Sequence, residues 1–359
     1  MGLGLGLFLV YLLFNKSKTI YANRFLALIL VFTIFQLLNF LIFANGLNID
    51  IPRIALFFST STLLLGPLHF LYTFFLSNQK LEFKPKYILL CLLFALANLF
   101  FIPLYLKPST EVYNYFYENQ AFFNAMNYIS SIQSIVFMIL SLKVLKKSLK
   151  RVKNSYSVID KINLNWLKIL TYLILLFISI LLVNLFLDSI IDLPEYFNPG
   201  PIAALLLTLM IYITGFLGLR QPEIILIATP DTIKKYKTSG LSATQAEIIR
   251  SKLLQVIETE KPFLDKDLTI LKLASMLNTS TAYLSQVINE KMNKNFYDLI
   301  NYYRIKEAKK RMADPKYSHY TLLGIAFDVG FNSKSTFNSI FKKYTNQTPS
   351  QYSKSLTKK

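Results

Sequence analysis

The residues best suited to specific recognition chemistry lie in segment 322–344, LLGIAFDVGFNSKSTFNSIFKKY. Apolar residues at helical spacing before Gly330 predict a short helix. Gly330 predicts a tight turn, because glycine accepts the positive φ that other residues resist. Ser333 is a residue type that caps a new helix, and Phe337 and Phe341 then recur at the spacing of a buried helix face. The segment therefore predicts a helix, a turn and a second helix.

The outer face of this second helix is predicted to be polar and basic. Hydroxyl and amide groups can hydrogen-bond base edges, and lysines can pair with phosphates, so this face suits a reader of the DNA major groove. The alternative is an ordinary helical hairpin with a solvated face. The candidate DNA contacts of this unit are Ser333, Lys334, Ser335, Thr336, Asn338, Ser339, Lys342 and Lys343.

Residues 268–290 repeat this plan upstream. Ile270 and Leu273 belong to a first apolar helix face, and Leu284 and Ile288 anchor a second one. The residues on the other side of the second helix are expected to be exposed. The candidate DNA contacts of this unit are Ser280, Thr281, Ser285, Gln286 and Asn289.

A single helix over Asn295–Met312 is predicted between the two units. Its candidate buried residues are Phe296, Leu299, Ile300, Tyr303, Ile305 and Ala308. Its basic residues, Arg304, Lys306, Lys309, Lys310 and Arg311, are expected on the outside.

Two helix-turn-helix units joined by one helix resemble the AraC/XylS-type DNA-binding domain. The resemblance covers residues 268–352 and is carried by A-S-M-L-N-T-S-x-x-Y-L-S, Y-R-I-K-E-A-K, I-A-F-D-V-G-F-N-S-K-S-T-F and F-K-K-Y-T-N-Q-T-P-S-Q-Y. It implies duplex DNA as the partner. Many members of the family carry Arg or Lys where this chain has Gln286, and Arg where it has Ser339. Bidentate pairing of arginine with guanine is therefore not expected at these two positions.

The rest of the chain has a different composition. The 359 residues are 53% hydrophobic and only 16% charged, with 39 basic and 20 acidic residues. Residues 1–219 contain apolar runs of which most are close to the ~20 residues that cross a bilayer. These runs predict seven spans, at 2–14, 22–43, 54–76, 87–106, 122–142, 166–187 and 200–219. The first span is short, but no basic residues precede it as they would in a signal peptide.

Loop charges predict the orientation of the spans, because basic loops mark the cytoplasmic side. The loops after spans one, three and five are basic, with Lys16, Lys18 and Arg24, then Lys80, Lys84 and Lys86, then Lys143, Lys146, Lys147, Lys150, Arg151, Lys153 and Lys161. The loops after spans two, four and six are not basic overall. Their charged residues are, in order, Asp50 and Arg53; Lys107, Glu111 and Glu118; and Asp188, Asp192 and Glu195. The N-terminus is therefore expected outside, and the C-terminal domain in the cytoplasm, where DNA is.

The spans contain almost no charge, which argues against an ion or proton pathway. Polar residues in the fifth span favour helix packing, with a polar ligand cavity as the alternative. His69 is expected to be satisfied by a neighbouring helix or, alternatively, to contact a ligand. The candidate ligand residues are Arg53, His69, Asn127 and Asp188.

Residues 220–261 are predicted to connect the two halves. Pro222 and Pro230 interrupt the last span, and Ser242 with Gln245 forms a capping-box signature at the start of a helix. Apolar residues predict that this helix packs on the DNA-binding domain or, alternatively, across a homodimer. It is expected to lie on the only covalent route from the membrane to the DNA-binding domain.

The sequence thus predicts an all-α protein, with a seven-helix transmembrane bundle at 1–219 and two helix-turn-helix units joined by a helix at 262–359. No catalytic constellation, metal site or cofactor motif is found, so we expect no enzyme. The architecture resembles membrane-embedded AraC-type regulators of bacteria. This resemblance implies a multi-pass protein of the inner membrane that contacts lipids, binds DNA and receives an unknown small-molecule or envelope signal. The alternative is a membrane tether that releases a soluble regulator by proteolysis.

Overall fold

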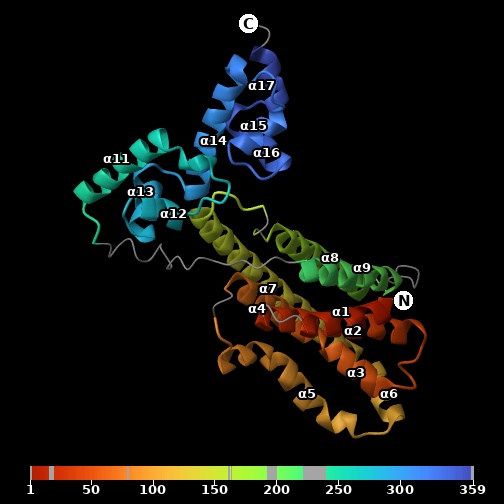
Figure 1. The fold of residues 1–359 in the computed structure, drawn as a ribbon. Coiled ribbons are helices and arrows are strands. Elements are labelled where there is room, and N and C mark those ends of the chain that lie inside the picture. The colour runs from red at the N-terminus through yellow and green to blue at the C-terminus, as the bar shows by residue number, and fades with distance from the viewer. Residues whose placement is uncertain are drawn as a thin grey trace. The chain divides into compact units, whose positions relative to one another are not determined.

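The computed structural model describes residues 2–15, 20–78, 81–160, 162, 164–191, 200–220 and 240–356. These residues form two compact units, shown in Figure 1. The first holds the described residues up to Lys146 and from 164 to 220, and the second holds 147–162 and 240–356. The linker 221–239, with Pro222 and Pro230, lies outside the described residues, as do Lys16, Lys18, Lys80, Lys161, Asp192 and Glu195.

The elements of the first unit's described part are all helices, joined by turns and short loops. Its elements are α1 (Gly2–Asn15), α2 (Ile20–Ala44), α3 (Pro52–Thr60), α4 (Thr62–Ser77), η1 (Pro85–Cys91), α5 (Leu92–Tyr105), α6 (Ser109–Glu118), α7 (Gln120–Ser155, whose last turns belong to the second unit), α8 (Asn165–Ile191) and α9 (Gly200–Arg220).

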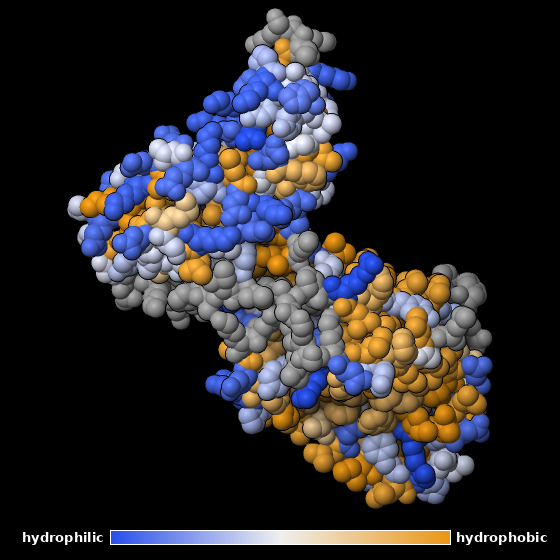
Figure 2. Space-filling view, in the orientation of Figure 1, coloured by the Kyte–Doolittle hydropathy of each residue, from blue (hydrophilic) through white to orange (hydrophobic). Residues whose placement is uncertain are grey.

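Six helical stretches of the described residues are long and apolar enough to cross a membrane. They are Tyr21–Ala44, Pro52–Ser77, Pro85–Tyr105, Gln120–Ser155, Asn165–Ile191 and Pro201–Arg220. Leucine and isoleucine side chains on their outer faces are exposed, for example Leu89 at 66% and Ile190 at 62%, and Figure 2 shows the resulting hydrophobic surface. Such a surface suits lipid rather than water. The first predicted span, 2–14, corresponds to α1, which is shorter than these six, and its crossing of the membrane remains a prediction.

Close helix packing holds the first unit together. One apolar core joins α1, α2, α4, α7, α8 and α9 through buried residues such as Leu13, Leu30, Leu71 and Leu167. α4 and α7 approach closely at Gly66, where an added Cβ would lie 2.9 Å from the Ser134 Cα. This contact agrees with the expectation that small residues of the fifth predicted span pack against neighbouring helices.

The second unit contains the predicted helix-turn-helix units. Its elements are α11 (Ala243–Thr259), η4 (Pro262–Leu264), α12 (Ile270–Met276), α13 (Thr281–Lys291), α14 (Phe296–Ala313), η5 (Pro315–Tyr317), α15 (Leu322–Asp328), α16 (Lys334–Thr345) and α17 (Pro349–Leu356). In the described part of the chain the only β pairing is an isolated bridge between Tyr156 and Thr269. The all-α fold predicted from the sequence is confirmed.

Capping residues begin these helices where the sequence predicts. The Ser242 Oγ accepts a hydrogen bond from the Gln245 backbone N–H, and the Gln245 side chain accepts from the Ser242 N–H, so the predicted capping box is confirmed. The Ser280 and Ser333 hydroxyls cap α13 and α16 in the same way. Each cap satisfies a backbone donor that would otherwise lack a partner at a helix start.

α14 lies between two helical lobes, as Figure 1 shows. One lobe has a core formed by α11, α12, α13 and the first turns of α14. The other has a core formed by α15, α16 and later turns of α14, to which Val152 and Ile159 also contribute. The predicted buried residues Phe296, Ile300 and Ala308 are at most 1% exposed. α14 is therefore shared by both helix-turn-helix units.

Candidate nucleic-acid interface

The turn before α16 requires a glycine for two reasons. Gly330 adopts φ +96°, which disfavours any residue with a side chain. In addition, a Cβ on Gly330 would lie 2.7 Å from the Phe263 carbonyl oxygen and 2.9 Å from the Arg304 Nε. The backbone at Gly330 is thus packed against Phe263, which belongs to the lobe formed by α11, α12 and α13. This turn sets the direction in which α16 leaves α15.

α16 presents the face predicted from its sequence. Phe337 and Phe341 are buried as predicted, at 1% and 0% exposure. Five of the candidate contacts, Lys334, Ser335, Ser339, Lys342 and Lys343, are exposed, and three, Ser333, Thr336 and Asn338, are half-buried. Lys343 also forms an ion pair with Asp298, with a Nζ–Oδ1 distance of 2.7 Å. A basic and polar ridge therefore begins at the N-terminus of α16 and follows its outer face.

α13, the corresponding helix of the upstream helix-turn-helix unit, is less exposed to solvent than predicted. Ser280, at its N-cap, is exposed, and Thr281 and Asn289 are half-buried. Ser285 and Gln286 are only 3% and 8% exposed, so the prediction that they lie outside is wrong. α13 packs against α11, α12 and α14, and this packing on several sides leaves a narrower exposed face than the sequence pattern indicates.

Polar side chains of α13 bond within the helix. The Asn289 Nδ2 donates to the Ser285 carbonyl oxygen at 2.7 Å, and the Gln286 Nε2 donates to the Glu290 Oε2 at 3.0 Å. Base readout by Gln286 would require both exposure and a change of hydrogen-bond partner.

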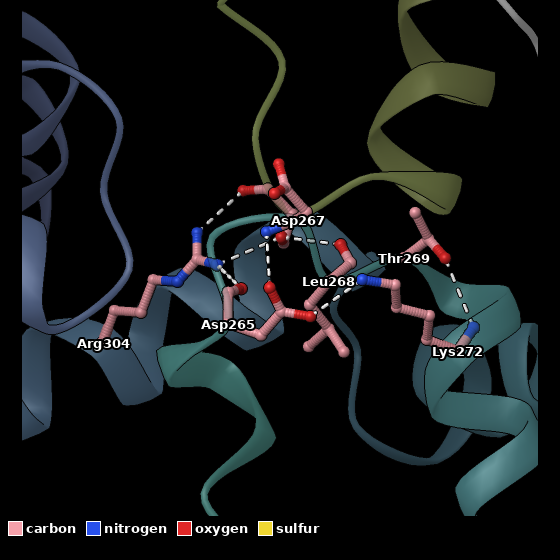
Figure 3. A network of polar contacts seen from close by, with 7 residues as sticks. Asp265, Asp267, Leu268, Thr269, Lys272 and Arg304 are labelled. Carbon is pink, nitrogen blue, oxygen red and sulfur yellow. Dashed lines mark hydrogen bonds and ion pairs between the residues drawn. The ribbon is translucent and has the colours of Figure 1, made fainter.

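Arg304 hydrogen-bonds several segments of the second compact unit, and Figure 3 shows its guanidinium beside Asp265. Its Nε donates to the Phe263 carbonyl oxygen at 2.7 Å, and one terminal nitrogen donates to the Asp265 carbonyl oxygen at 2.8 Å. The two terminal nitrogens also donate to Ser157, to its carbonyl oxygen at 3.2 Å and to its Oγ at 3.1 Å. The planar guanidinium can hold several acceptors in one fixed geometry.

The prediction that Arg304 is exposed is therefore wrong, since its side chain is 0% exposed. Burial lowers the pKa of Arg304 to about 10, while the charge of Asp265 opposes that change. The sequence contained a usable signal, because Arg304 lies four residues after Ile300 and four before Ala308, on the apolar stripe of the helix.

Asp160 is a second residue that the sequence did not indicate as part of this region. Its Oδ2 accepts a hydrogen bond from the Ser333 hydroxyl at 2.9 Å, and its Oδ1 accepts one from the Thr336 hydroxyl at 2.6 Å. Both donors are candidate DNA contacts at the start of α16. The carboxylate also lies where the helix dipole favours a negative charge.

The first unit holds a cavity of about 690 Å³, a volume typical of small-molecule sites. Three of the four candidate ligand residues, His69, Asn127 and Asp188, line it. Arg53 is not among the lining residues, and its guanidinium donates instead to the Lys107 carbonyl oxygen. Among the described lining residues Asp188 is the only acidic side chain and none is Lys or Arg.

His69 lies within hydrogen-bonding distance of a neighbouring helix. Its Nε2 is 3.0 Å from the Thr171 Oγ1, and the His69 side chain is 3% exposed. This agrees with the interpretation that a neighbouring helix satisfies the histidine. The same ring lines the cavity, so both roles predicted for His69 stay compatible with the structure.

Comparison with known proteins supports the assignment of the second unit. Residues 273–355 match a family described as a helix-turn-helix domain. Over 110 residues the chain is 31% identical to an uncharacterised HTH-type transcriptional regulator of Staphylococcus aureus (strain COL), covering 31% of this chain and 14% of that protein. Over 88 residues it is 33% identical to the raffinose operon transcriptional regulatory protein RafR of Pediococcus pentosaceus, covering 24% of this chain and 31% of RafR.

One solved structure is also similar to part of the chain. It is the C-terminal domain of AraT, a response regulator from Geobacillus stearothermophilus, with 28% identity and a TM-score of 0.27, covering 33% of this chain and 88% of that one. The two curated relatives are matched over only 14% and 31% of their lengths. The C-terminal part of the chain is an AraC-type helix-turn-helix domain, a DNA-binding class rather than an enzyme class.

Proposed function

We infer that this chain is a membrane-integral transcription regulator that binds specific duplex DNA and responds to a signal received by its transmembrane helices. The observation that carries this function is the presence, in one chain, of an AraC-type helix-turn-helix domain and six helical stretches of membrane-spanning length. The relatives named as transcriptional regulators support it. The outward-facing leucine and isoleucine side chains of the first unit support its contact with lipid.

DNA binding is tested with the full-length protein in lipid nanodiscs, by selection from a random duplex library. The selected duplex should bind more tightly than a scrambled one, and affinity should fall steeply with salt because phosphate contacts release counterions. Lys342→Ala should weaken both duplexes evenly and reduce the salt slope by about one. Lys343→Ala should have a smaller effect, because Asp298 already neutralises part of its charge. Salt-independent binding, or enrichment of no sequence, would contradict the assignment.

The proposed orientation places the N-terminus outside and the helix-turn-helix domain in the cytoplasm. It rests on the loop charges and on α1 crossing the membrane together with the six longer helical stretches. Reporter fusions after residues 48, 112, 155 and 193 test it, and only the fusion after 155 should report the cytoplasm. A cytoplasmic result at 48 or 112 would overturn the orientation.

The cavity of the first unit is the proposed receptor for the signal. Its amide and hydroxyl groups, with the Asp188 carboxylate and no Lys or Arg among the described lining residues, suit an amphipathic, hydrogen-bonding molecule that carries no negative charge. Ser131→Leu should fill the cavity, while Ile129→Leu alters an exposed position of the same helix and serves as the control. Mass spectrometry should detect a small molecule that co-purifies with the wild-type and Ile129→Leu proteins and is absent from Ser131→Leu. Equal recovery from all three would exclude this site.

The alternative function, a tether cut to release a soluble regulator, predicts a C-terminal fragment. Proteins tagged at both ends should remain full-length and membrane-bound under inducing and non-inducing conditions if the intact chain is active. A soluble C-terminal fragment that appears only on induction would favour the tether.

A further inference from the structure

The chain that follows the transmembrane part of α7 belongs to the DNA-binding unit. α7 ends at Ser155, and residues 147–162 cluster with residues 240–356 rather than with the apolar helices. We refer to the described residues 147–160 and 162 as the arm. The sequence predicted this stretch only as a basic cytoplasmic loop. The linker 220–261 is therefore not the only covalent connection between the two units, because the arm is a second one.

Apolar and backbone contacts anchor the arm. Val152 and Ile159, at 2% and 9% exposure, are part of the core formed with α14, α15 and α16. The Ser157 hydroxyl and backbone N–H both donate to the Leu268 carbonyl oxygen, at 2.8 and 3.3 Å. Together with the Arg304 bonds, these contacts attach the arm to segments of both helix-turn-helix units.

The end of the arm contacts the proposed DNA-reading helix. The two Asp160 oxygens accept hydrogen bonds from the hydroxyls of Ser333 and Thr336, the first residues of the α16 face. In helix-turn-helix proteins, N-terminal residues of the recognition helix contact base edges, and helix N-termini also bind phosphate. A carboxylate in this position engages the same donors and repels the phosphates of an approaching duplex.

We propose that the arm is an intrachain inhibitor of DNA binding, in which Asp160 and duplex DNA compete for the Ser333–Thr336 end of α16. This inference rests on the proposed function. The anchor contacts of Ser157 and Val152 do not involve the carboxylate, so Asp160 can leave α16 while the arm stays attached. α7 contains cavity-lining Ser134 and arm residue Val152, and it is thus the covalent path by which an occupied cavity shifts this competition.

The test compares three full-length variants in nanodiscs, using the duplex selected with the wild-type protein. Asp160→Asn keeps the size of the side chain and removes its charge, and Asp160→Gly removes the whole group. Glu260→Gln is the matched control, because it removes one negative charge from an exposed position at the end of α11, in the lobe that does not contain α16. Thermal unfolding of each variant shows whether the second compact unit, which contains the DNA-binding domain, stays folded.

Both Asp160 variants should bind DNA about tenfold more tightly than Glu260→Gln, as expected when a charge-assisted hydrogen bond no longer has to be broken. Affinities equal to or weaker than the control would overturn the inference. So would misfolding of both variants, since Asp160 would then be needed for the fold itself. Failure of the wild-type and control proteins to bind any selected duplex would instead refute the proposed function, so the two failures are distinguishable.

Discussion

The two helix-turn-helix units share a plan but differ in how their second helices are exposed. In the downstream unit, the outer face of α16 is open along Lys334, Ser339 and Lys342, and its first turn is held by Asp160. In the upstream unit, the middle of α13 is covered at Ser285 and Gln286. The same local pattern thus produces one open recognition helix and one that is partly covered. We therefore expect sequence readout to depend chiefly on α16.

The turns of the two units also differ, and substitution there should have the largest effect. Gly330→Ala combines an unfavourable φ with a Cβ 2.7 Å from a carbonyl oxygen, and should lower the free energy of unfolding of unit 2 by roughly 3 kcal/mol. Asn278, the turn residue of the upstream unit, has φ +50°, and Asn278→Ala should cost only about 1 kcal/mol. Chemical denaturation measures both, and equal losses would show that the two turns are equivalent.

A second prediction tests how Arg304 links the two helix-turn-helix units. Arg304→Ala leaves the buried Phe263 carbonyl group without its donor and removes one of two donors from the carbonyl groups of Asp265 and Ser157. It should lower the stability of the second unit by about 2–3 kcal/mol. Arg304→Lys should recover only part of this loss, since an ammonium cannot reproduce the planar fork. Denaturant unfolding followed by circular dichroism provides the measurement. A fully stable Arg304→Lys protein would mean that charge alone, rather than the fork, holds the units together.

The difference in exposure between the recognition helices predicts unequal effects on DNA. Asn338→Ala, on α16, should alter preference at one base position and cost about 1–2 kcal/mol of binding free energy. Gln286→Ala, on α13, should cost well under 1 kcal/mol, because its side chain is buried. Competition binding with single-base variants of the selected duplex separates the two. A larger effect from Gln286→Ala would indicate that α13 is uncovered when DNA binds.

The smallest predicted effect concerns a chain of ion pairs centred on Glu307, which connects the two helix-turn-helix units. Burial raises the pKa of Glu307, but hydrogen bonds from Lys261 and Arg311 outweigh burial and leave its pKa below the usual value. Lys261 precedes the upstream unit, and Arg311 also approaches Asp328 of the downstream one, at 3.6 Å. A lowered carboxyl pKa stabilises the fold above the unfolded-state pKa and loses that effect as pH falls through the folded-state pKa.

Glu307→Gln should therefore destabilise unit 2 modestly near pH 7 and show no penalty in strongly acidic solution. Unfolding curves of wild type and Glu307→Gln between pH 7 and pH 3 check this, with Glu260→Gln as the exposed control. A difference that does not shrink as the pH falls would exclude an electrostatic origin.

Much of this protein follows from local sequence pattern. Apolar residues at helical spacing, together with the caps at Ser242, Ser280 and Ser333, correctly predicted the helices and the buried face of α16. Long apolar runs likewise indicated the helices of the first unit. These features depend on residues a few positions apart, so the linear sequence contains the information that specifies them.

The sequence did not reveal which polar residues the packing would enclose. Arg304 bonds Ser157, 147 positions away, and Asp160 bonds Thr336, 176 positions away. The exposed side of α13 likewise depends on how α11, α12 and α14 surround it. Helical periodicity determines which residues share a face, whereas only the folded chain determines what lies against that face. The tertiary structure alone therefore placed Arg304 inside the domain, narrowed the open face of α13, and brought a carboxylate from the arm onto α16.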